Sequence, residues 1–287
     1  MRASLLEGHA RRSRGVYSTA VIDTHCHLTF PDFAGRIDEV LDEARAAGVT
    51  GAITISTTSQ DAESIQAIAE AHENVWCSSG VHPLYADKGP HDWGAVRRLG
   101  EHPKCVAFGE LGLDKHHSKP PINLQQKVLG EQLAHIETWK ADGLELPVVL
   151  HCRKAFDDLI PILRETTLNP ERFVFHCFTG GPEEARQALD FGAMISFTGV
   201  VTYKNAGEVG EAAALVPLDR IMCETDAPFL SPEPKRGVRP CVPAFTALTA
   251  RHVATIKGVA FDEFHQAINA NTERFFGIRV PEAPAPA

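Results

Sequence analysis

The chain of 287 residues lacks any apolar run of 18 residues, the length that a membrane-spanning helix needs. Its first 18 residues carry four arginines and lack the apolar middle of a secretory signal. We therefore expect no membrane association and a cytoplasmic location. Residues 1–18 are expected to be a disordered extension, with a transit peptide as the alternative, and residues 280–287 a disordered tail rich in Pro and Ala.

An excess of basic residues is also missing, since the formal net charge is −9. Proteins that coat nucleic acid through phosphate contacts are usually basic. The acidic balance argues against a stable nucleic-acid binder. It still allows an enzyme that holds one strand end locally, because metal ions can neutralise part of the acidity. No pattern in the sequence indicates a stable protein partner.

Paired cysteine spacing is absent too. The seven cysteines form neither a zinc ribbon nor a secreted disulfide framework, so we interpret them as small buried side chains in a reducing compartment. Cys26, Cys152 and Cys177 each follow a histidine. Because side chains alternate along a strand, these three thiols are predicted to point away from the histidines, into the layer between strands and helices.

What the sequence does contain is a large apolar fraction, 44%, arranged in eight short runs. The runs are near 20–22, 51–55, 75–78, 105–108, 147–150, 173–175, 193–196 and 220–223. Their starts lie roughly 20–45 residues apart, with helical periodicity between them, which is typical of successive βα units. The pattern predicts a single (β/α)₈ barrel over residues 19–279, with the active site at the carboxyl ends of the strands.

An open doubly wound sheet is the alternative fold. That fold commonly carries a Gly-rich phosphate loop after its first strand. Here the sequence Asp-Thr-His-Cys-His occupies that place, at residues 23–27. The barrel is therefore favoured.

Metal-capable side chains end several of the apolar runs. His25 and His27 are two apart and so share one face of a strand, an arrangement that suits a divalent transition metal. Glu110 follows a small apolar strand, where a carboxylate is costly unless it is paired or metal-bound. Its two oxygens make it the natural bridge between two ions, and His151 and His176 would complete the second site.

Other acids near these ends have predicted supporting roles. Asp226 is the candidate ligand and general base that accepts the proton of the attacking water. Glu224 shares its face and is predicted to orient a ligand. Asp114 either orients a ligand or caps a helix.

Three further residues are candidate substrate contacts. His82 ends the third strand and is predicted to touch substrate, the alternative being a hydrogen bond within its loop. Arg153 shares a face with His151 and suits a phosphate, the alternative being a surface ion pair. Arg236 lies in a cationic, Pro-rich loop at 232–240, where a phosphate is expected to bind in this acidic chain, the alternative being a solvated loop with ordinary Lys and Arg.

Taken in order, the motifs resemble those of the TatD family of metal-dependent hydrolases, within the amidohydrolase-like barrel superfamily. The resemblance runs from about residue 21 to 276. It rests on Asp-Thr-His-Cys-His-Leu at 23–28, Gly-Val-His-Pro at 80–83, Gly-Glu-Leu-Gly-Leu-Asp at 109–114, His-Cys-Arg at 151–153, His-Cys-Phe-Thr-Gly at 176–180, Ser-Phe-Thr-Gly at 196–199, Glu-Thr-Asp-Ala-Pro-Phe-Leu at 224–230 and Asn-Thr-Glu-Arg-Phe-Phe at 271–276.

The resemblance implies that His25, His27, Glu110 and Asp226 hold one metal, and Glu110, His151 and His176 the second. It implies a magnesium- or manganese-dependent deoxyribonuclease, often an exonuclease. The chain departs from the family at 239–243, where Arg-Pro-Cys-Val-Pro replaces a segment that commonly carries Asn.

The leading hypothesis is thus a hydrolase with two divalent ions (Mg, Mn or Zn) that cuts phosphodiester bonds as a 3′→5′ exonuclease would, with DNA as a transient substrate. The alternatives are hydrolysis of a small ester, amide or aminoacyl bond on the same centre, and a barrel scaffold without catalysis.

Overall fold

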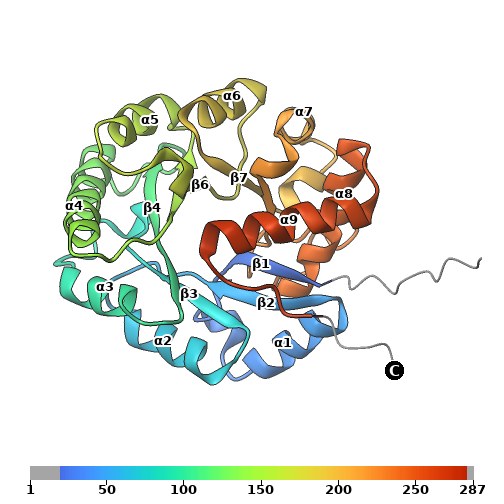
Figure 1. The fold of residues 1–287 in the computed structure, drawn as a ribbon, viewed down its shortest axis with the longest axis horizontal. Coiled ribbons are helices and arrows are strands. Elements are labelled where there is room, and N and C mark those ends of the chain that lie inside the picture. The colour runs from blue at the N-terminus through green and yellow to red at the C-terminus, as the bar shows by residue number, and fades with distance from the viewer. Residues whose placement is uncertain (1–19, 283–287) are drawn as a thin grey trace, which may run out of the picture.

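Eight parallel strands form one sheet that curves into a barrel in the computed structural model, which describes residues 20–282. The strands pair in chain order, each with the next, as Figure 1 shows. They are β1 (Val21–Cys26), β2 (Val49–Thr54), β3 (Val75–Ser79), β4 (Cys105–Asp114), β5 (Val148–Arg153), β6 (Phe173–Phe175), β7 (Met194–Phe197) and β8 (Ile221–Cys223). The predicted (β/α)₈ barrel is confirmed.

Helices alternate with the strands and surround the barrel (Figure 1). They are α1 (Ile37–Ala46), α2 (Ala62–Ala71), α3 (Trp93–Gly100), α4 (Ile122–Ala141), α5 (Phe156–Arg164), α6 (Pro182–Phe191), α7 (Gly207–Leu215), α8 (Thr246–Lys257) and α9 (Phe261–Phe276). Short 3₁₀ turns are η1 (Pro31–Phe33), η2 (Pro83–Tyr85), η3 (Pro170–Arg172), η4 (Gly199–Thr202), η5 (Leu218–Arg220) and η6 (Pro243–Phe245). Within the described residues, no helix is long and apolar enough to cross a membrane.

The seam between β1 and the segment after β8 closes the barrel. The amide of Asp226 donates to the carbonyl of His25 at 2.9 Å, and the amide of His27 donates to the carbonyl of Ala227 at 2.7 Å. Cys26 and Ala227 form a parallel bridge there. The barrel therefore closes at the place where the first candidate ligands lie.

The barrel interior holds a separate apolar cluster built from the inward-facing residues of the strands, such as Ile22, Val106 and Val149. Phe275 and Phe276 of α9 belong to the same cluster. Figure 1 shows α9 crossing the end of the barrel instead of joining the outer ring. This end holds the first residues of the strands, so α9 closes the amino end and leaves the carboxyl end for the site.

Three strands extend three or more residues further than their apolar runs predict. The expected strand at 20–22 continues as β1 to Cys26. The expected strand at 105–108 continues as β4 to Asp114, and the one at 147–150 continues as β5 to Arg153. The difference has one cause: His25, Glu110 and His151 are polar yet buried or half-buried inside paired strands, so the end of apolar sequence did not mark the end of the strand. At β6, which contains no such residue, the predicted bounds are those observed.

Gly109 and Gly112 allow the close approach of β4 to β5. Their φ angles are +139° and +145°, a region that L side chains rarely adopt. A Cβ atom at Gly109 would lie 2.6 Å from the carbonyl oxygen of Val149, and one at Gly112 would collide with the carbonyl of His151. The two glycines therefore keep β4 against β5 on either side of Glu110.

Two of the three predicted thiol positions agree with the structure. Cys152 packs in the main layer between strands and helices, and Cys26 packs in a cluster beneath α1. The prediction is wrong for Cys177, which is half-buried with its sulfur 3.7 Å from the Thr198 hydroxyl. The reason is that β6 ends at Phe175 and Cys177 has a φ of +44°, so strand alternation no longer applies there.

The described chain continues past the barrel at its carboxyl end. The amide of Val280 donates to the Glu273 carboxylate at 2.9 Å, and the Thr50 hydroxyl donates to the carbonyl of Pro281 at 2.9 Å. The predicted extension at 1–18 and residues 283–287 of the predicted tail lie outside the described residues.

Candidate metal centre

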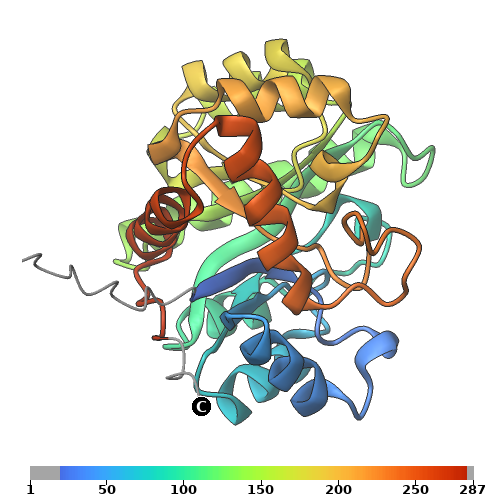
Figure 2. The same ribbon diagram turned by 90° about the vertical axis from the view of Figure 1, so that its right-hand side faces the viewer.

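Side chains from five strands meet at the carboxyl end of the barrel. Figure 2 shows the barrel from the side, with the loop after β8, in orange, projecting beyond this end. All six predicted ligands lie here. Three groups of side chains are spaced closely enough to hold an ion: His25, His27 and Asp226; His25, His176 and Glu224; and His82, Glu110 and His151.

Glu110 occupies the middle of this arrangement and is only 1% exposed. Its Oε2 lies 3.3 Å from Nε2 of His25. Its Oε1 lies 2.7 Å from Nδ1 of His151 and 2.5 Å from Nε2 of His176. The two carboxylate oxygens thus face two different sets of histidines.

Burial would by itself raise the pKa of Glu110, because a charge in a low-dielectric interior is disfavoured. The positive charge of His176 and the hydrogen bonds from His151 and His176 outweigh burial and hold that pKa well below its usual range. Glu110 is therefore an anion at neutral pH, the form that a bridging ligand requires.

Asp226 faces the two histidines of β1. Its Oδ1 lies 3.3 Å from Nε2 of His27 and 3.7 Å from Nε2 of His25. The left-handed backbone at Asp226, with a φ of +62°, and the seam hydrogen bonds fix it there. Burial opposes ionisation, but the hydrogen bond from His27 and the charges of His25 and His27 lower the pKa of Asp226.

Asp114 takes one of the two roles that the sequence left open: it orients a histidine and does not cap a helix, because the next helix, α4, begins at Ile122 with Pro121 as its N-cap. Its Oδ2 lies 3.0 Å from Nε2 of His151, and its Oδ1 accepts hydrogen bonds of 2.8 Å from the amides of His116 and His117. A carboxylate on one ring nitrogen leaves the other free to bind a metal. Asp114 therefore points Nδ1 of His151 at Glu110 while it caps the loop after β4.

Glu224 supports His176 in a comparable way. Its Oε1 lies 3.3 Å from Nδ1 of His176 and accepts a 2.6 Å hydrogen bond from the Cys177 amide. Its Oε2 accepts a 2.7 Å hydrogen bond from the Ser196 hydroxyl. The carboxylate ties β6, β7 and β8 together behind His176, in line with the predicted orienting role.

Asp23 is a structural part of the site to which sequence reasoning assigned no role. Its carboxylate accepts hydrogen bonds from the amide and hydroxyl of Thr225, at 2.9 and 2.5 Å, and from the amide of His25 at 3.3 Å. Burial raises the pKa of Asp23 to about 8. The available signal was an acid two residues before His25, hence on the same face of a strand.

His82 lies among the predicted ligands, beside the carboxylate of Glu110, and not at the outer edge of the site. Its Nε2 lies 3.3 Å from Oε1 of Glu110 and 3.1 Å from Nδ1 of His151. Its Nδ1 accepts a 2.9 Å hydrogen bond from the Leu84 amide, so the loop hydrogen bond and the position in the site occur together. Burial lowers the pKa of His82 to about 4, which leaves the ring neutral at pH 7.

The two predicted arginine contacts stand further out. Arg153 is exposed at the end of β5, where its charge lowers the pKa of His116. Arg236 is exposed on the loop after β8; its guanidinium lies 4.1 Å from the centre of the Tyr203 ring and donates to Asn205 at 3.5 Å. The structure thus brings the six predicted ligands together, with the arginines outside them.

The buried ring nitrogens fit a metal site. Among the residues described, six buried side-chain atoms lack a hydrogen-bond partner, and three of them are Nδ1 and Nε2 of His25 and Nδ1 of His176. The His25 and His176 rings stack in parallel, 3.8 Å apart. Unpartnered buried polar atoms are costly, and imidazole with carboxylate is a common donor set for divalent ions.

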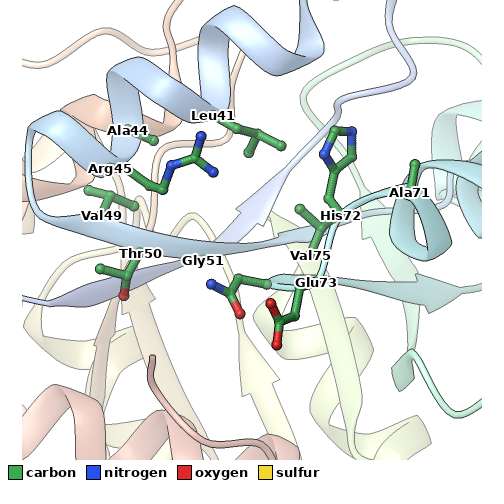
Figure 3. Close-up of a pocket in the computed structure, with 11 residues that line it drawn as sticks. Leu41, Ala44, Arg45, Val49, Thr50, Gly51, Ala71, His72, Glu73 and Val75 are labelled. Atoms are coloured by element: carbon green, nitrogen blue, oxygen red, sulfur yellow. The ribbon is translucent and has the colours of Figure 1, made fainter. Parts of the chain in front are cut away.

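A separate hollow of about 250 Å³ lies at the opposite end of the barrel, beside the first residues of β2 and β3. Arg45, His72 and Glu73 line it (Figure 3). None of the three groups able to hold an ion in residues 20–282 includes a residue of this hollow. The chemistry therefore belongs to the carboxyl end.

Comparison with known proteins identifies the family. The family model described as TatD related DNase matches residues 22–277. The chain belongs to this family. TatD-type proteins are metal-dependent hydrolases, and this chain is therefore an enzyme of that class.

Individual relatives agree with this assignment. The chain is 37% identical over 261 residues to the "Uncharacterized metal-dependent hydrolase YcfH" of Escherichia coli, covering 90% of this chain and 96% of that protein. It is 33% identical to the "3'-5' ssDNA/RNA exonuclease TatD" of Pantoea ananatis, covering 90% and 100%. The crystal structure of YJJV, a TatD homolog from Escherichia coli, superposes with a TM-score of 0.81 at 31% identity, covering 90% and 98%.

Proposed function

We propose that this TatD-type hydrolase is a 3′→5′ exonuclease that removes nucleotides from the end of single-stranded nucleic acid, DNA first, using two divalent ions (Mg, Mn or Zn). The observation that carries the proposal is Glu110, whose two oxygens face two separate sets of histidines. The relative from Pantoea ananatis named as a 3′–5′ ssDNA/RNA exonuclease supports the choice of substrate. Seven unpaired cysteines support a cytoplasmic setting.

In this proposal His25, His27, Glu110 and Asp226 would hold one ion, and Glu110, His151 and His176 would hold the other. When bound, a pair of divalent ions activates a water and neutralises charge on the scissile phosphate. Asp114 and Glu224 keep the rings of His151 and His176 in position.

Asp226 is the proposed general base. Its lowered pKa keeps it ionised at neutral pH, so it can accept the proton of the attacking water. Burial of the surrounding rings excludes bulk water, which strengthens electrostatic interactions within the site.

His82 is the proposed donor to the substrate. The Leu84 amide occupies its Nδ1, and the ring is neutral at pH 7, so its single proton lies on Nε2. That N–H can donate to a phosphate oxygen beside Glu110. Arg153 and Arg236, both exposed, are the proposed contacts to phosphates further along the strand.

The test is digestion of a 3′-labelled and a 5′-labelled single-stranded DNA oligonucleotide by wild type and Glu110→Gln, with Mg or Mn and then with EDTA. We expect the 5′-labelled strand to shorten stepwise and the 3′ label to leave at once, only with wild type and metal. Circular dichroism should show that Glu110→Gln stays folded, since the substitution keeps the size of the side chain.

Unchanged turnover by Glu110→Gln would refute the two-ion centre. An intact oligonucleotide in every wild-type lane, together with metal-dependent cleavage of a small ester or aminoacyl substrate, would refute the nuclease but keep the hydrolase.

A further inference from the structure

Phe229 is an exposed aromatic side chain at the mouth of the metal centre. It follows the proposed ligand Asp226 by three residues and is 38% exposed. Among residues 20–282, the only other large apolar side chain exposed to this degree is Val238, at 46%, on the same loop. Single exposed apolar residues are common on proteins, so exposure alone implies nothing.

The ring of Phe229 continues a row of rings that begins at the metal centre. Phe30 stacks on His27 with ring centres 4.8 Å apart and an interplanar angle of 25°. Phe229 meets Phe30 edge-on, with centres 5.9 Å apart and an angle of 82°. Phe30 is half-buried and Phe229 faces solvent. The row therefore leads from a proposed ligand outward to the point where a substrate would arrive.

The backbone holds Phe229 in place. Its amide donates to the carbonyl of Asp226 at 3.0 Å, and the amide of Cys241 donates to the carbonyl of Pro228 at 2.9 Å. Cys241 is fully buried in the cluster that also contains Ala227. An exposed ring on an anchored backbone loses little conformational entropy when a ligand packs on it.

Cations gather on the same loop although the whole chain carries a net charge of −9. Lys235, Arg236 and Arg239 are all exposed there. The guanidinium of Arg236 lies over the ring of Tyr203 at 4.1 Å. Aromatic platforms beside positive charges are the usual means by which proteins bind single-stranded nucleic acid, since bases stack on the rings and phosphates meet the cations.

We propose that Phe229, supported by Phe30, is the platform on which a base next to the scissile phosphate stacks. The inference rests on the proposed exonuclease function and specifies its substrate. A base inside a duplex presents no free face, so this subsite selects unpaired ends. The Phe229 ring is a binding group and takes no part in the chemical step.

The test compares wild type and Phe229→Ala on two single-stranded oligonucleotides of one sequence, of which the second has abasic sugars at its two 3′-terminal positions. Stacking on one ring corresponds to about a tenfold change in KM. We expect Phe229→Ala to raise KM about tenfold on the complete strand with a smaller change in kcat. The abasic strand should raise the wild-type KM similarly, and Phe229→Ala should add nothing on that strand.

Three controls accompany the measurement. Phe229→Trp should keep the wild-type KM, because it retains a ring. Phe229→Leu should behave as the alanine variant does. Val238→Ala, which removes an equally exposed apolar side chain from the same loop, should change neither KM nor kcat. Equal metal content in all variants would exclude damage to the centre.

The outcomes separate the two proposals. If wild type cuts the complete strand but Phe229→Ala affects both strands equally, or neither, the stacking subsite is refuted and the exonuclease stands. If wild type cuts neither strand while it hydrolyses a small ester with metal, the exonuclease is refuted and the subsite with it.

Discussion

Distances alone would allow His82 either to hold a metal or to donate a hydrogen bond to the substrate. The position of the proton on its ring distinguishes these two roles. His82 lies close enough to Glu110 and His151 to be grouped with them as a possible ligand set. Its Nδ1, however, already accepts a hydrogen bond from Leu84. A neutral ring then carries its proton on Nε2, the atom that faces the site, and a protonated nitrogen has no lone pair for a metal.

We therefore expect His82→Ala to lower kcat by about 100- to 1,000-fold, as removal of one donor to developing charge does. The content of bound metal should stay that of wild type. Metal analysis of the purified protein alongside steady-state kinetics on the oligonucleotide would measure both. His82→Gln, whose amide can still donate, should recover part of the activity.

His91→Ala is the matched control, because His91 lies in the same loop before α3 and donates only to the carbonyl of Ala86. It should retain wild-type kinetics. If His82→Ala instead loses an equivalent of metal, His82 is a ligand and the donor role is wrong.

The sequence predicted which residues meet at the candidate metal centre better than it predicted what each of them does there. His25, Glu110 and Asp226 were recognisable because polar side chains at the ends of apolar strands need partners. The position of His82 among the predicted ligands was not recognisable from the sequence, because it depends on where the turn at Pro83 directs the ring. Asp23 was missed because its partner, Thr225, is 202 residues away in sequence.

At the scale of elements, α9 closes the amino end of the barrel. Phe275 is 3% exposed and packs among the inward-facing strand residues. We expect Phe275→Ala to lower the free energy of unfolding by about 3–5 kcal/mol, the usual cost of removing a buried aromatic ring. Urea denaturation followed by circular dichroism would measure it.

Gln266→Ala, at an exposed position of the same helix, should change the free energy of unfolding by less than about 0.5 kcal/mol. A similarly small effect for Phe275→Ala would mean that α9 does not close the barrel in solution.

The order of strands and helices was predictable because the periodicity of each segment is a local property of the sequence. The residues at which the strands end were not predictable. Glu110 interrupts the apolar pattern of β4, yet β4 continues through it to Asp114. Pairing with β5, a tertiary interaction, decides that end. Phe229 likewise gave no signal in sequence, because exposure of a ring depends on the packing of the loop that carries it.

At the scale of the whole molecule, net negative charge limits how a nucleic acid can be held. The loop after β8 offers three exposed cations, Lys235, Arg236 and Arg239. Each phosphate contact to a single strand contributes about −0.7 to the slope of log affinity against log salt, so these three cations and Arg153, the other proposed phosphate contact, give a slope of about −3. We expect log(1/KM) for the oligonucleotide to follow that slope at constant metal concentration.

The triple change of these cations to Gln should flatten the slope to about −0.7, the share of Arg153, whereas Lys127→Gln, on the outer helix α4, should leave it unchanged. A much steeper slope in wild type would reveal a longer basic track than this loop supplies.

The seam of the barrel has a consequence for biosynthesis. His27 and Asp226 are separated by 199 residues, and the hydrogen bonds that bring them together form only where β1 meets the segment after β8. A nascent chain on the ribosome exposes His25 and His27 long before their carboxylate partner Asp226 is made. A metal held by His25, His27 and Asp226 would therefore indicate that translation has passed β8. Chains truncated before Asp226 would be unable to hold a metal with these three residues.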